Sequence, residues 1–383
     1  MNFYYVSEGK LFSVEAETQR NIPSEAVAAY LRTVKDIKER REWKTTGQGA
    51  RFMGVEEDYI DETEAYAMVE ALASGTEKIV YAVSLENTCG IYSMEKADDS
   101  FSENYIVKKP DMRIHYLAYQ EPSETIVASF GQGGVEKHLA VCNGNTGDFR
   151  VLTEGNSVDI TPSFSKQKEN EILFSSAGFY ADSSGKIFYG AYAVNKLNLS
   201  TYNMEEILSD EKYDFLNPQQ LVNGTIYCIR RPKTTPSDKN TIGDVAMVPV
   251  RIAKSVFSWL NVFSQRYTGE SLLKKSGGIN PAKNRQKTEG ELFIEGNLIN
   301  VEKSLQENAL QDADTPGIIP KSWELVTIEG NVPPKVIASG VLSYYVSKNG
   351  EVVFSNGKYI KQMVNGQAIA LQDASLAKHL SGK

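Results

Sequence analysis

Histidine is the first residue type in this sequence whose chemistry could define a site. There are three, His115, His138 and His379, and imidazole is the side chain that most readily binds metals or exchanges protons near neutral pH. None stands in an H-x-x-x-H or H-E-x-x-H pattern, the spacings that bring two imidazoles to one metal ion. His115 and His138 fall in predicted strands, where we expect neighbouring groups to satisfy them. The sequence predicts no metal site and no catalytic histidine.

Other patterns typical of catalysis are equally sparse. The run Gly131–Gly134 resembles a phosphate loop in composition, but no Lys-Ser/Thr pair follows it, and it joins two predicted strands, which favours a turn. No G-x-S-x-G elbow provides a serine nucleophile. The acids Glu56–Asp58, Glu62 and Glu64 lie in a polar stretch and are interpreted as solvated surface. We expect neither catalytic residues nor a cofactor.

The cysteines indicate the compartment. Cys89, Cys142 and Cys228 are odd in number and widely spaced, which fits reduced core thiols in a cytosolic protein better than a disulfide framework. The first residues show no secretory signal. The longest apolar run, Val245–Val250, is far shorter than the roughly 18 residues that a spanning helix needs. The expected location is the cytoplasm, with a peripheral membrane association as the alternative.

A repeated hairpin pattern predicts the architecture. Between Val341 and Leu371, the pairs Asn349-Gly350, Asn356-Gly357 and Asn365-Gly366 separate four short β-rich segments. Asn and Gly tolerate the positive φ of type I′ turns, so each pair is expected to reverse the chain. The result is a four-stranded meander, which cannot bury both its faces alone and has the form of a propeller blade.

Copies of this blade recur upstream. Second-strand runs start at Ile79, Ile126, Ile172, Ile226 and Val352, with spacings of 47, 46, 54 and 126 residues. Periods of about 40 to 50 residues are typical of four-stranded blades. First strands are expected at 114–117, 160–165, 219–222 and 342–346. We therefore predict an all-β propeller of six blades, or of seven if 291–303, with its Gly296-Asn297 turn, forms a further blade hairpin.

One blade carries a family signature. The chain resembles the TolB-type propeller repeat, a relative of the WD repeat, at Leu152-Thr153, Asp159, Pro162–Ser165 and Ile172–Ser175. The family's Asp-Gly turn is replaced here by Lys166–Asn170. The resemblance implies the fold. Oligogalacturonate lyases look like TolB-type propellers and use several histidine ligands near the central channel, a set that this sequence does not match.

Two further segments near the N-terminus depart from the blade pattern. Ser24–Trp43 places apolar residues on one helical face behind a Ser24 N-cap, which predicts a helix inserted into the first blade. Tyr66–Ala73 has local helical character, but the repeat register places a first strand there. Both alternatives stay open for this segment.

The charge balance changes in one long segment. Residues 230–288 contain twelve basic and three acidic side chains, a formal charge of +9, so the rest of this −8 chain sums to −17. We interpret 232–290 as a basic insertion within a single propeller domain spanning 1–383. Such an asymmetry is typical of a protein that docks on an acidic surface.

Inside the insertion, 249–267 has the pattern of an amphipathic helix with large aromatic residues on one face and Lys and Arg flanking the other. This composition is typical of helices that lie on anionic membranes or in a partner's groove. Packing on the protein's own body is the competing interpretation, and nucleic acid ranks third. The expected docking residues are Arg251, Lys254, Phe257, Trp259, Leu260, Phe263 and Arg266.

These observations favour a non-catalytic function. Propellers present a rigid ring of loops around a channel, so we expect recognition of a protein or a small ligand on one face. The 249–267 helix would recruit the propeller to a membrane or partner. The alternative is a lyase or hydrolase with an unrecognised, metal-dependent site in the channel mouth.

Overall fold

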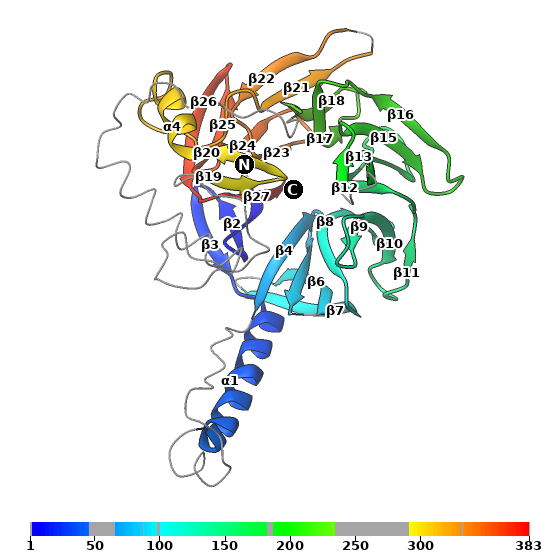
Figure 1. Ribbon diagram of the computed structural model, residues 1–383, viewed down its shortest axis with the longest axis vertical. Helices are drawn as coiled ribbons and strands as arrows, with labels where there is room; N and C mark the ends of the chain where they lie inside the picture. Colours follow the sequence, from blue (N-terminus) through cyan, green and yellow to red (C-terminus); the bar gives the residue numbers. More distant parts are fainter. Residues whose placement is uncertain are drawn as a thin grey trace.

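Six antiparallel sheets are arranged around a central axis, as the computed structural model shows in Figure 1. The structure describes residues 2–45, 66–86, 88–97, 100–181, 187–233, 291–330 and 332–382. Each sheet is a blade whose first strand lines the axis. These six sheets confirm the six-bladed propeller. Within the described ranges, no helix combines the length and the apolar content needed to cross a bilayer.

Three blades follow one another after the first helix. The first of them contains β4 (Ala67–Ser74), β5 (Lys78–Leu85), β6 (Thr88–Ala97) and β7 (Ser100–Pro110). The next contains β8 (Arg113–Gln120), β9 (Thr125–Gly131), β10 (His138–Asn143) and β11 (Phe149–Val151). The third contains β12 (Ser157–Phe164), β13 (Glu171–Ala181), β15 (Ala193–Asn198) and β16 (Met204–Leu208), and β14 (Ile187–Tyr189) pairs antiparallel with the end of β13.

The remaining blades include the insertion and the chain ends. One contains β17 (Tyr213–Gln220), β18 (Ile226–Pro232), β21 (Glu324–Ile328) and β22 (Lys335–Ser339), so residues 233–323 interrupt it between its second and third strands. The next contains β23 (Ser343–Val346), β24 (Val352–Ser355), β25 (Tyr359–Val364) and β26 (Gln367–Asp373). The last combines β27 (Lys378–Gly382) with β1 (Phe3–Ser7), β2 (Lys10–Glu15) and β3 (Thr18–Ile22).

The second strands are buried because blades pack on both of their faces. In β9, Ile126, Val127 and Ala128 are all 0% exposed. Val80 and Ala82 of β5 share one apolar cluster with Ile126 and Ala128. A strand covered on both faces needs a continuous apolar run rather than an alternating one. This is the physical reason that the second strands were the visible repeat in the sequence.

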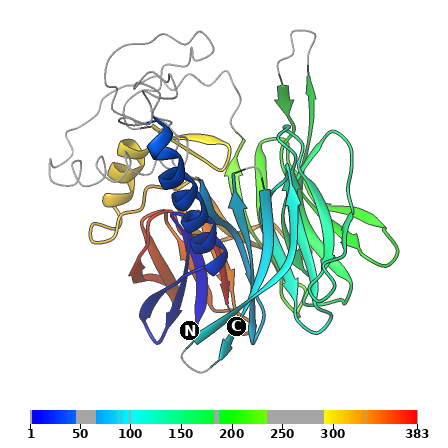
Figure 2. The ribbon, with the colours of Figure 1, turned by 90° about the horizontal axis from the view of Figure 1, so that it is seen from below.

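The ring is closed by pairing the two ends of the chain. β27 is the innermost strand of its blade and lies antiparallel to β1, with Phe3 opposite Gly382 and Val6 opposite Lys378. The N and C labels lie together near one face in Figure 2. The predicted pattern did not include this closure. It makes one blade depend on residues more than 350 positions apart.

Most first strands carry an additional residue where they line the axis. In the described sheets, these strands contain one residue more than the strand they pair with, and the register shifts at that point. The shifts lie near Glu70 in β4, His115 in β8, Thr161 in β12, Asn217 in β17 and His379 in β27. Three of these residues have positive φ, namely Thr161 (52°), Asn217 (53°) and His379 (53°). Bulges bend a strand and redirect its side chains, and they concentrate near functional sites. These bulges mark the axis as the region to examine.

Several predicted elements need correction. The seven-blade alternative is wrong, because β19 (Glu291–Ile294) and β20 (Asn297–Asn300) form a separate two-stranded sheet. The turn between them is Glu295-Gly296, with φ of 46° and 82°, so Asn297 already belongs to β20. The first strand predicted at 219–222 is β17, which starts earlier, at Tyr213. Its Pro218 and polar residues hide the strand pattern.

The Asn-Gly turns are confirmed in position but not all in type. Each separates two consecutive strands of the β23–β26 meander. Asn365 and Gly366 have φ of 51° and 80°, as a type I′ turn requires. At the other two pairs only the glycines, Gly350 and Gly357, have positive φ. Those connections are longer, and a single left-handed residue is enough to reverse the chain there.

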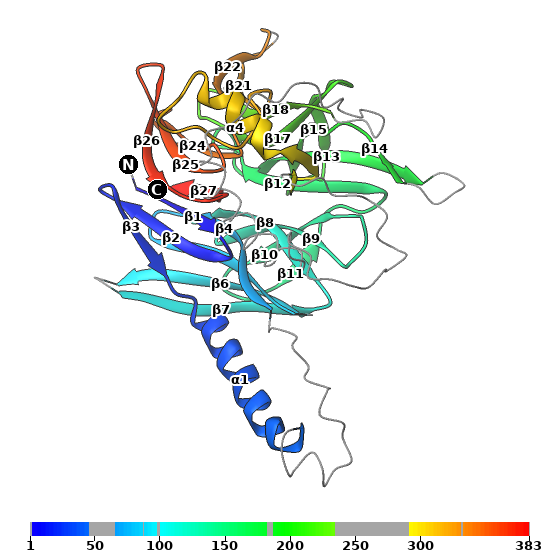
Figure 3. The ribbon, with the colours of Figure 1, turned by 60° about the vertical axis from the view of Figure 1, so that its left-hand side comes forward.

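The predicted N-terminal helix exists, but it lies between blades. Helix α1 (Glu25–Thr45) follows the outermost strand β3, and the Ser24 hydroxyl accepts a hydrogen bond from the Val27 amide at 3.3 Å. Val27 and Tyr30 pack on the blade core, whereas Leu31 and Ile37 are 40% and 42% exposed. Figure 3 shows the helix projecting from the ring. The segment 66–73 is strand β4, because its pairing with β5 overrides the helical preference of its alanines.

A hairpin and a helix cover one end of the channel. Helix α4 (Val301–Ala309) follows β20, and Leu292, Ile299 and Leu305 form a buried cluster with Leu342 and Leu376. In Figure 2 the β19–β20 hairpin and α4, both yellow, lie on the face opposite the N and C labels. The predicted helix at 249–267 lies outside the described residues. The described ends of the insertion, Lys233 and Glu291, continue into β18 and β19.

Candidate functional site

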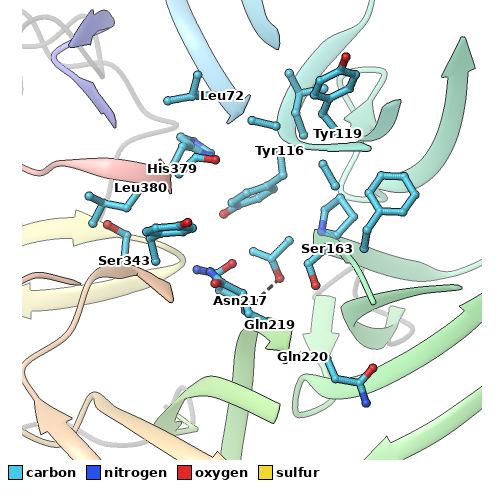
Figure 4. Close-up of a pocket in the computed structure, with 18 of the residues that line it drawn as sticks. Leu72, Tyr116, Tyr119, Ser163, Asn217, Gln219, Gln220, Ser343, His379 and Leu380 are labelled. Carbon is cyan, nitrogen blue, oxygen red and sulfur yellow. Dashed lines mark hydrogen bonds between the residues drawn. The ribbon is translucent and has the colours of Figure 1, made fainter. Parts of the chain in front are cut away.

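The central channel contains a cavity of about 880 Å³. First strands of the blades supply its walls, as Figure 4 shows for Tyr116, Asn217 and His379. At one end the lining comes from the turns between first and second strands, including the exposed residues Lys168 and Val222. At the other end it comes from the tip of the β19–β20 hairpin. The cavity therefore has an open mouth on the turn side and a closed end beneath the hairpin.

The wall on the open side is a hydrogen-bond network of amide and hydroxyl groups. The Asn217 amide N–H donates to Thr161 Oγ1 at 3.0 Å, and Tyr344 Oη donates to the Asn217 carbonyl at 2.5 Å. Gln219 Nε2 donates to the Tyr344 carbonyl at 3.1 Å. The Ser163 hydroxyl donates to the Pro218 carbonyl at 2.5 Å. These contacts join three neighbouring first strands, so the bulges position a rigid polar wall.

The closed end is built around the carboxylate of Glu295 at the hairpin tip. Lys378 Nζ donates to its Oε1 at 2.5 Å, and Tyr116 Oη donates to its Oε2 at 2.5 Å. Arg231 Nη1 donates to its backbone carbonyl at 2.7 Å. Tyr116 and Lys378 are on first strands, whereas Glu295 is on the insertion. The three contacts fasten the hairpin into the end of the channel.

A second ion pair supports the first. Arg231 Nε lies 3.1 Å from Asp214 Oδ2, and the two side chains are only 4% and 8% exposed. The Arg231 guanidinium also lies 4.8 Å from the centre of the Trp323 ring. The other Asp214 oxygen accepts from the Tyr192 amide at 3.1 Å. A buried ion pair is tolerable only when its remaining hydrogen-bonding groups are satisfied, and this pair meets that condition.

Burial and neighbouring charges set the protonation states at the closed end. Burial disfavours ionisation of Glu295, but Lys378 and the hydrogen bonds outweigh it and hold the Glu295 pKa well below its usual value. Burial, together with the Glu295 charge, raises the Tyr116 pKa well above 10.0. Burial, then Lys378, lowers the His379 pKa to about 4. Burial, then Lys137, lowers the His115 pKa to about 3. Both imidazoles are therefore neutral at neutral pH.

The structure places the histidines and cysteines of the sequence analysis. His379 lies on blade strand β27 and lines the cavity, with its ring 5.3 Å from that of Tyr116. The sequence pattern predicts blade strands at His115 and His138 and misses the one at His379. His138 Nδ1 is buried and has no hydrogen-bond partner in the described part of the chain, contrary to expectation. Cys142 and Cys228 are buried in strands, as predicted. The described residues contain no group of three or more His, Cys, Asp or Glu that could hold a metal ion.

The predicted docking residues cannot be placed, because all seven lie outside the described residues. The basic segment defined in the sequence also needs a correction at its start. Arg230 and Arg231 belong to strand β18, where they pair with Glu324 and Asp214, so they are part of the propeller body. The run Gly131–Gly134 connects β9 to β10, which confirms the turn.

Sequence reasoning missed the residues that meet at the closed end. Tyr116, Arg231, Glu295 and Lys378 come from four separate elements and match no local motif. The only usable signal was the turn next to Glu295, which indicated a hairpin but not its place in the channel. Lys137, at the start of β10, also lines the cavity, and burial lowers its pKa.

Comparison with known proteins supports the fold. No protein-family model matches this chain, and no curated protein matches it. TolB from Acinetobacter baumannii aligns with 99% of this chain at 8% identity and a TM-score of 0.50, and this chain covers 65% of that structure. The tricorn protease aligns with 99% at 8% identity and a TM-score of 0.47, with 34% of its own length covered. An oligogalacturonate lyase from Vibrio parahaemolyticus aligns with 93% at 12% identity and a TM-score of 0.40, with 71% covered.

The likeness to TolB is a likeness of fold. The chain spans less than two thirds of the length of the TolB structure. At 8% identity, the likeness concerns the propeller alone, and a shared fold does not determine a shared function. The resemblance seen in the Pro162–Ser165 blade is thus confirmed as a fold resemblance.

Proposed function

We propose that this propeller is a non-catalytic recognition module that takes a small ligand, or a segment of a partner protein, into the open end of its channel. The observation that carries the proposal is the division of the cavity into two parts. Neutral amides and hydroxyls line the open side, whereas the closed end holds two ion pairs, Lys378 with Glu295 and Arg231 with Asp214. A rigid, partly apolar cavity with convergent polar groups is typical of a binding site.

The mouth offers a direct test. Val222 is 67% exposed and lines the cavity at its open end, whereas Val332, 65% exposed, lies on a turn away from it. Ligands found in a thermal-shift screen of metabolites and short peptides should stabilise the wild type and Val332→Trp. The same ligands should fail to stabilise Val222→Trp, because the indole obstructs the mouth. Equal stabilisation of all three proteins would place the binding elsewhere and contradict the proposal.

A lyase or hydrolase at the channel is the second candidate. The neutral imidazole of His379 lies beside Tyr116 in the cavity, and titratable groups with shifted pKa values are enriched at catalytic sites. The screen distinguishes the two functions when each ligand is recovered and weighed by mass spectrometry. An unchanged ligand supports recognition, and a cleaved ligand supports catalysis.

We also propose that the basic insertion, 232–290, recruits a cytoplasmic propeller to an anionic membrane or to a partner protein. Its described flanks are Lys233, directly after β18, and Glu291, the first residue of the hairpin that closes the channel. Deleting residues 250–275 should abolish sedimentation with vesicles containing phosphatidylserine, or co-purification with the partner. The difference in sedimentation between the full chain and the deletion protein should shrink as the salt concentration rises, because salt screens the charge attraction that binds the full chain. Retention of both by the deletion protein would reject this function.

A further inference from the structure

Lys137 is held against the channel wall by its backbone. Its amide donates to the Ser157 carbonyl at 3.2 Å, and its carbonyl accepts from the Asp159 amide at 2.8 Å. These bonds tie the start of β10 to the neighbouring first strand β12. The Lys137 side chain lines the cavity and is partly buried. The backbone therefore holds the Lys137 side chain against the channel wall.

Lys137 differs from the other cations at the closed end because it lacks a partner. Lys378 binds Glu295, and Arg231 binds Asp214. Among the described residues, Lys137 Nζ makes no hydrogen bond or ion pair. The nearby carboxylates are committed, Glu295 to Lys378 and Tyr116, and Glu70 to the Tyr66 hydroxyl at 2.8 Å. A partly buried ammonium without a partner has lost some of its hydration, and an anion entering the cavity would offset that cost.

The lining of the cavity as a whole carries an excess of positive charge. Its described lining contains six cations and three carboxylates, an excess of +3 in a chain of −8. One of those carboxylates, Glu121, is already bound by the amides of Thr76 and Glu77, at 2.8 Å each. The cations are Lys137, Lys166, Lys168, Arg231, Lys348 and Lys378. Lys166, Lys168 and Lys348 belong to the mouth turns, so an anion meets positive charge along its path, and low-dielectric walls strengthen that field.

We propose that Lys137 is an anion-binding residue that receives a carboxylate of the channel ligand, which makes the ligand an organic acid. The inference rests on the proposed recognition function and specifies its ligand class. The choice of a carboxylate follows from the adjacent contact, where Lys378 and Tyr116 each bind one oxygen of Glu295. A ligand carboxylate at Lys137 would form the same kind of lysine–carboxylate contact that Lys378 forms with Glu295, and charge-assisted hydrogen bonds of this kind are among the stronger ones.

The test uses the full chain and two matched probes, the dicarboxylate glutarate and its neutral diamide, glutaramide. By isothermal titration calorimetry, glutarate should bind the wild type at least tenfold more tightly than glutaramide does. Lys137→Met should weaken glutarate binding at least tenfold, and Lys137→Arg should restore it. Lys335→Met, a change at an exposed lysine on the outer strand β22, should leave it unchanged.

The outcomes separate this inference from the proposed function. Loss of glutarate binding in Val222→Trp but not in Lys137→Met supports recognition in the channel and rejects Lys137 as the anion site. No glutarate binding by the wild type, or equal binding of glutarate and glutaramide, rejects the organic-acid ligand and leaves recognition of neutral ligands intact. Inorganic phosphate binding more tightly than glutarate overturns the choice of a carboxylate. If Lys137→Met without ligand unfolds at a different temperature from the wild type, that variant has a folding defect. The Lys137→Arg protein then decides whether Lys137 is the anion site: glutarate binding by Lys137→Arg supports it, and loss of binding rejects it.

Discussion

A chain that ends at Ala374 is expected not to fold. It lacks β27, so the innermost strand of one blade is absent and the buried strand β1 has an unpaired edge. Leu376 and Leu380, at 3% and 6% exposure, are lost with it, and a buried leucine contributes about 2–5 kcal/mol. Because total stability is about 5–15 kcal/mol, we expect loss of the cooperative thermal transition, measured by circular dichroism and calorimetry.

A circular permutant provides the control. Linking Gly382 to Phe3, which are paired neighbours, and opening the exposed Asn365-Gly366 turn keeps every strand while moving the chain ends. This permutant should unfold cooperatively near the wild-type temperature, since opening an exposed turn is well tolerated. Cooperative unfolding of the truncated chain at the wild-type temperature would show that β27 does not close the ring.

Glu295→Gln should cost about 2–4 kcal/mol of unfolding free energy, because it removes a charged acceptor from Lys378 and Tyr116 and leaves the closed end with excess positive charge. The Glu295 and Lys378 side chains are each 23% exposed, which keeps the value below that of a fully buried pair. Urea unfolding at neutral pH measures the loss. Glu307→Gln, at an exposed i,i+4 pair on α4, should cost about 0.3–0.5 kcal/mol.

The pH dependence gives a second measure of the same contact. The pKa of Glu295 is lower in the folded state than the ordinary glutamate value of about 4.3. Its contribution is therefore complete above that value and is lost as the pH falls below it. The wild type should lose stability more steeply than Glu295→Gln on acidification below about pH 5. Parallel curves of stability against pH for the two proteins would mean that Glu295 is not the stabilising anion. His115 and His379, whose pKa values are also shifted, are present in both proteins and cannot produce a difference between the curves.

How far the fold could be predicted depended on how each strand is buried. Second strands such as β9, covered on both faces, appear as apolar runs, and they revealed the period. Strand β4 is rich in alanine, which favours a helix locally, and its pairing with β5 decided the outcome. Strand β27, Lys378–Gly382, has too few apolar residues to indicate a strand. Its place follows only from a partner at the other end of the chain.

The site was less predictable than the fold because its contacts are non-local. Tyr116 and Glu295 are 179 residues apart in the sequence, and Lys378 lies 83 residues from Glu295. No spacing rule joins such residues, since each is positioned by a different blade. Arg231 was counted with the basic segment 230–288 because it lies near the start of that segment, although burial against Asp214 and Trp323 fixes it in the propeller. Charge composition can indicate a basic segment, but only tertiary packing decides which cations line a cavity.

The pairing of β27 with β1 has a consequence for synthesis on the ribosome. Strands β1 to β3 emerge first, yet the edge of β1 stays unpaired until residues 378–382 have been translated and have left the exit tunnel. An exposed strand edge is prone to pair with other chains. Nascent chains therefore carry an adhesive edge for nearly the whole of translation, and stalled or prematurely released chains are expected to be clients of chaperones that shield such edges.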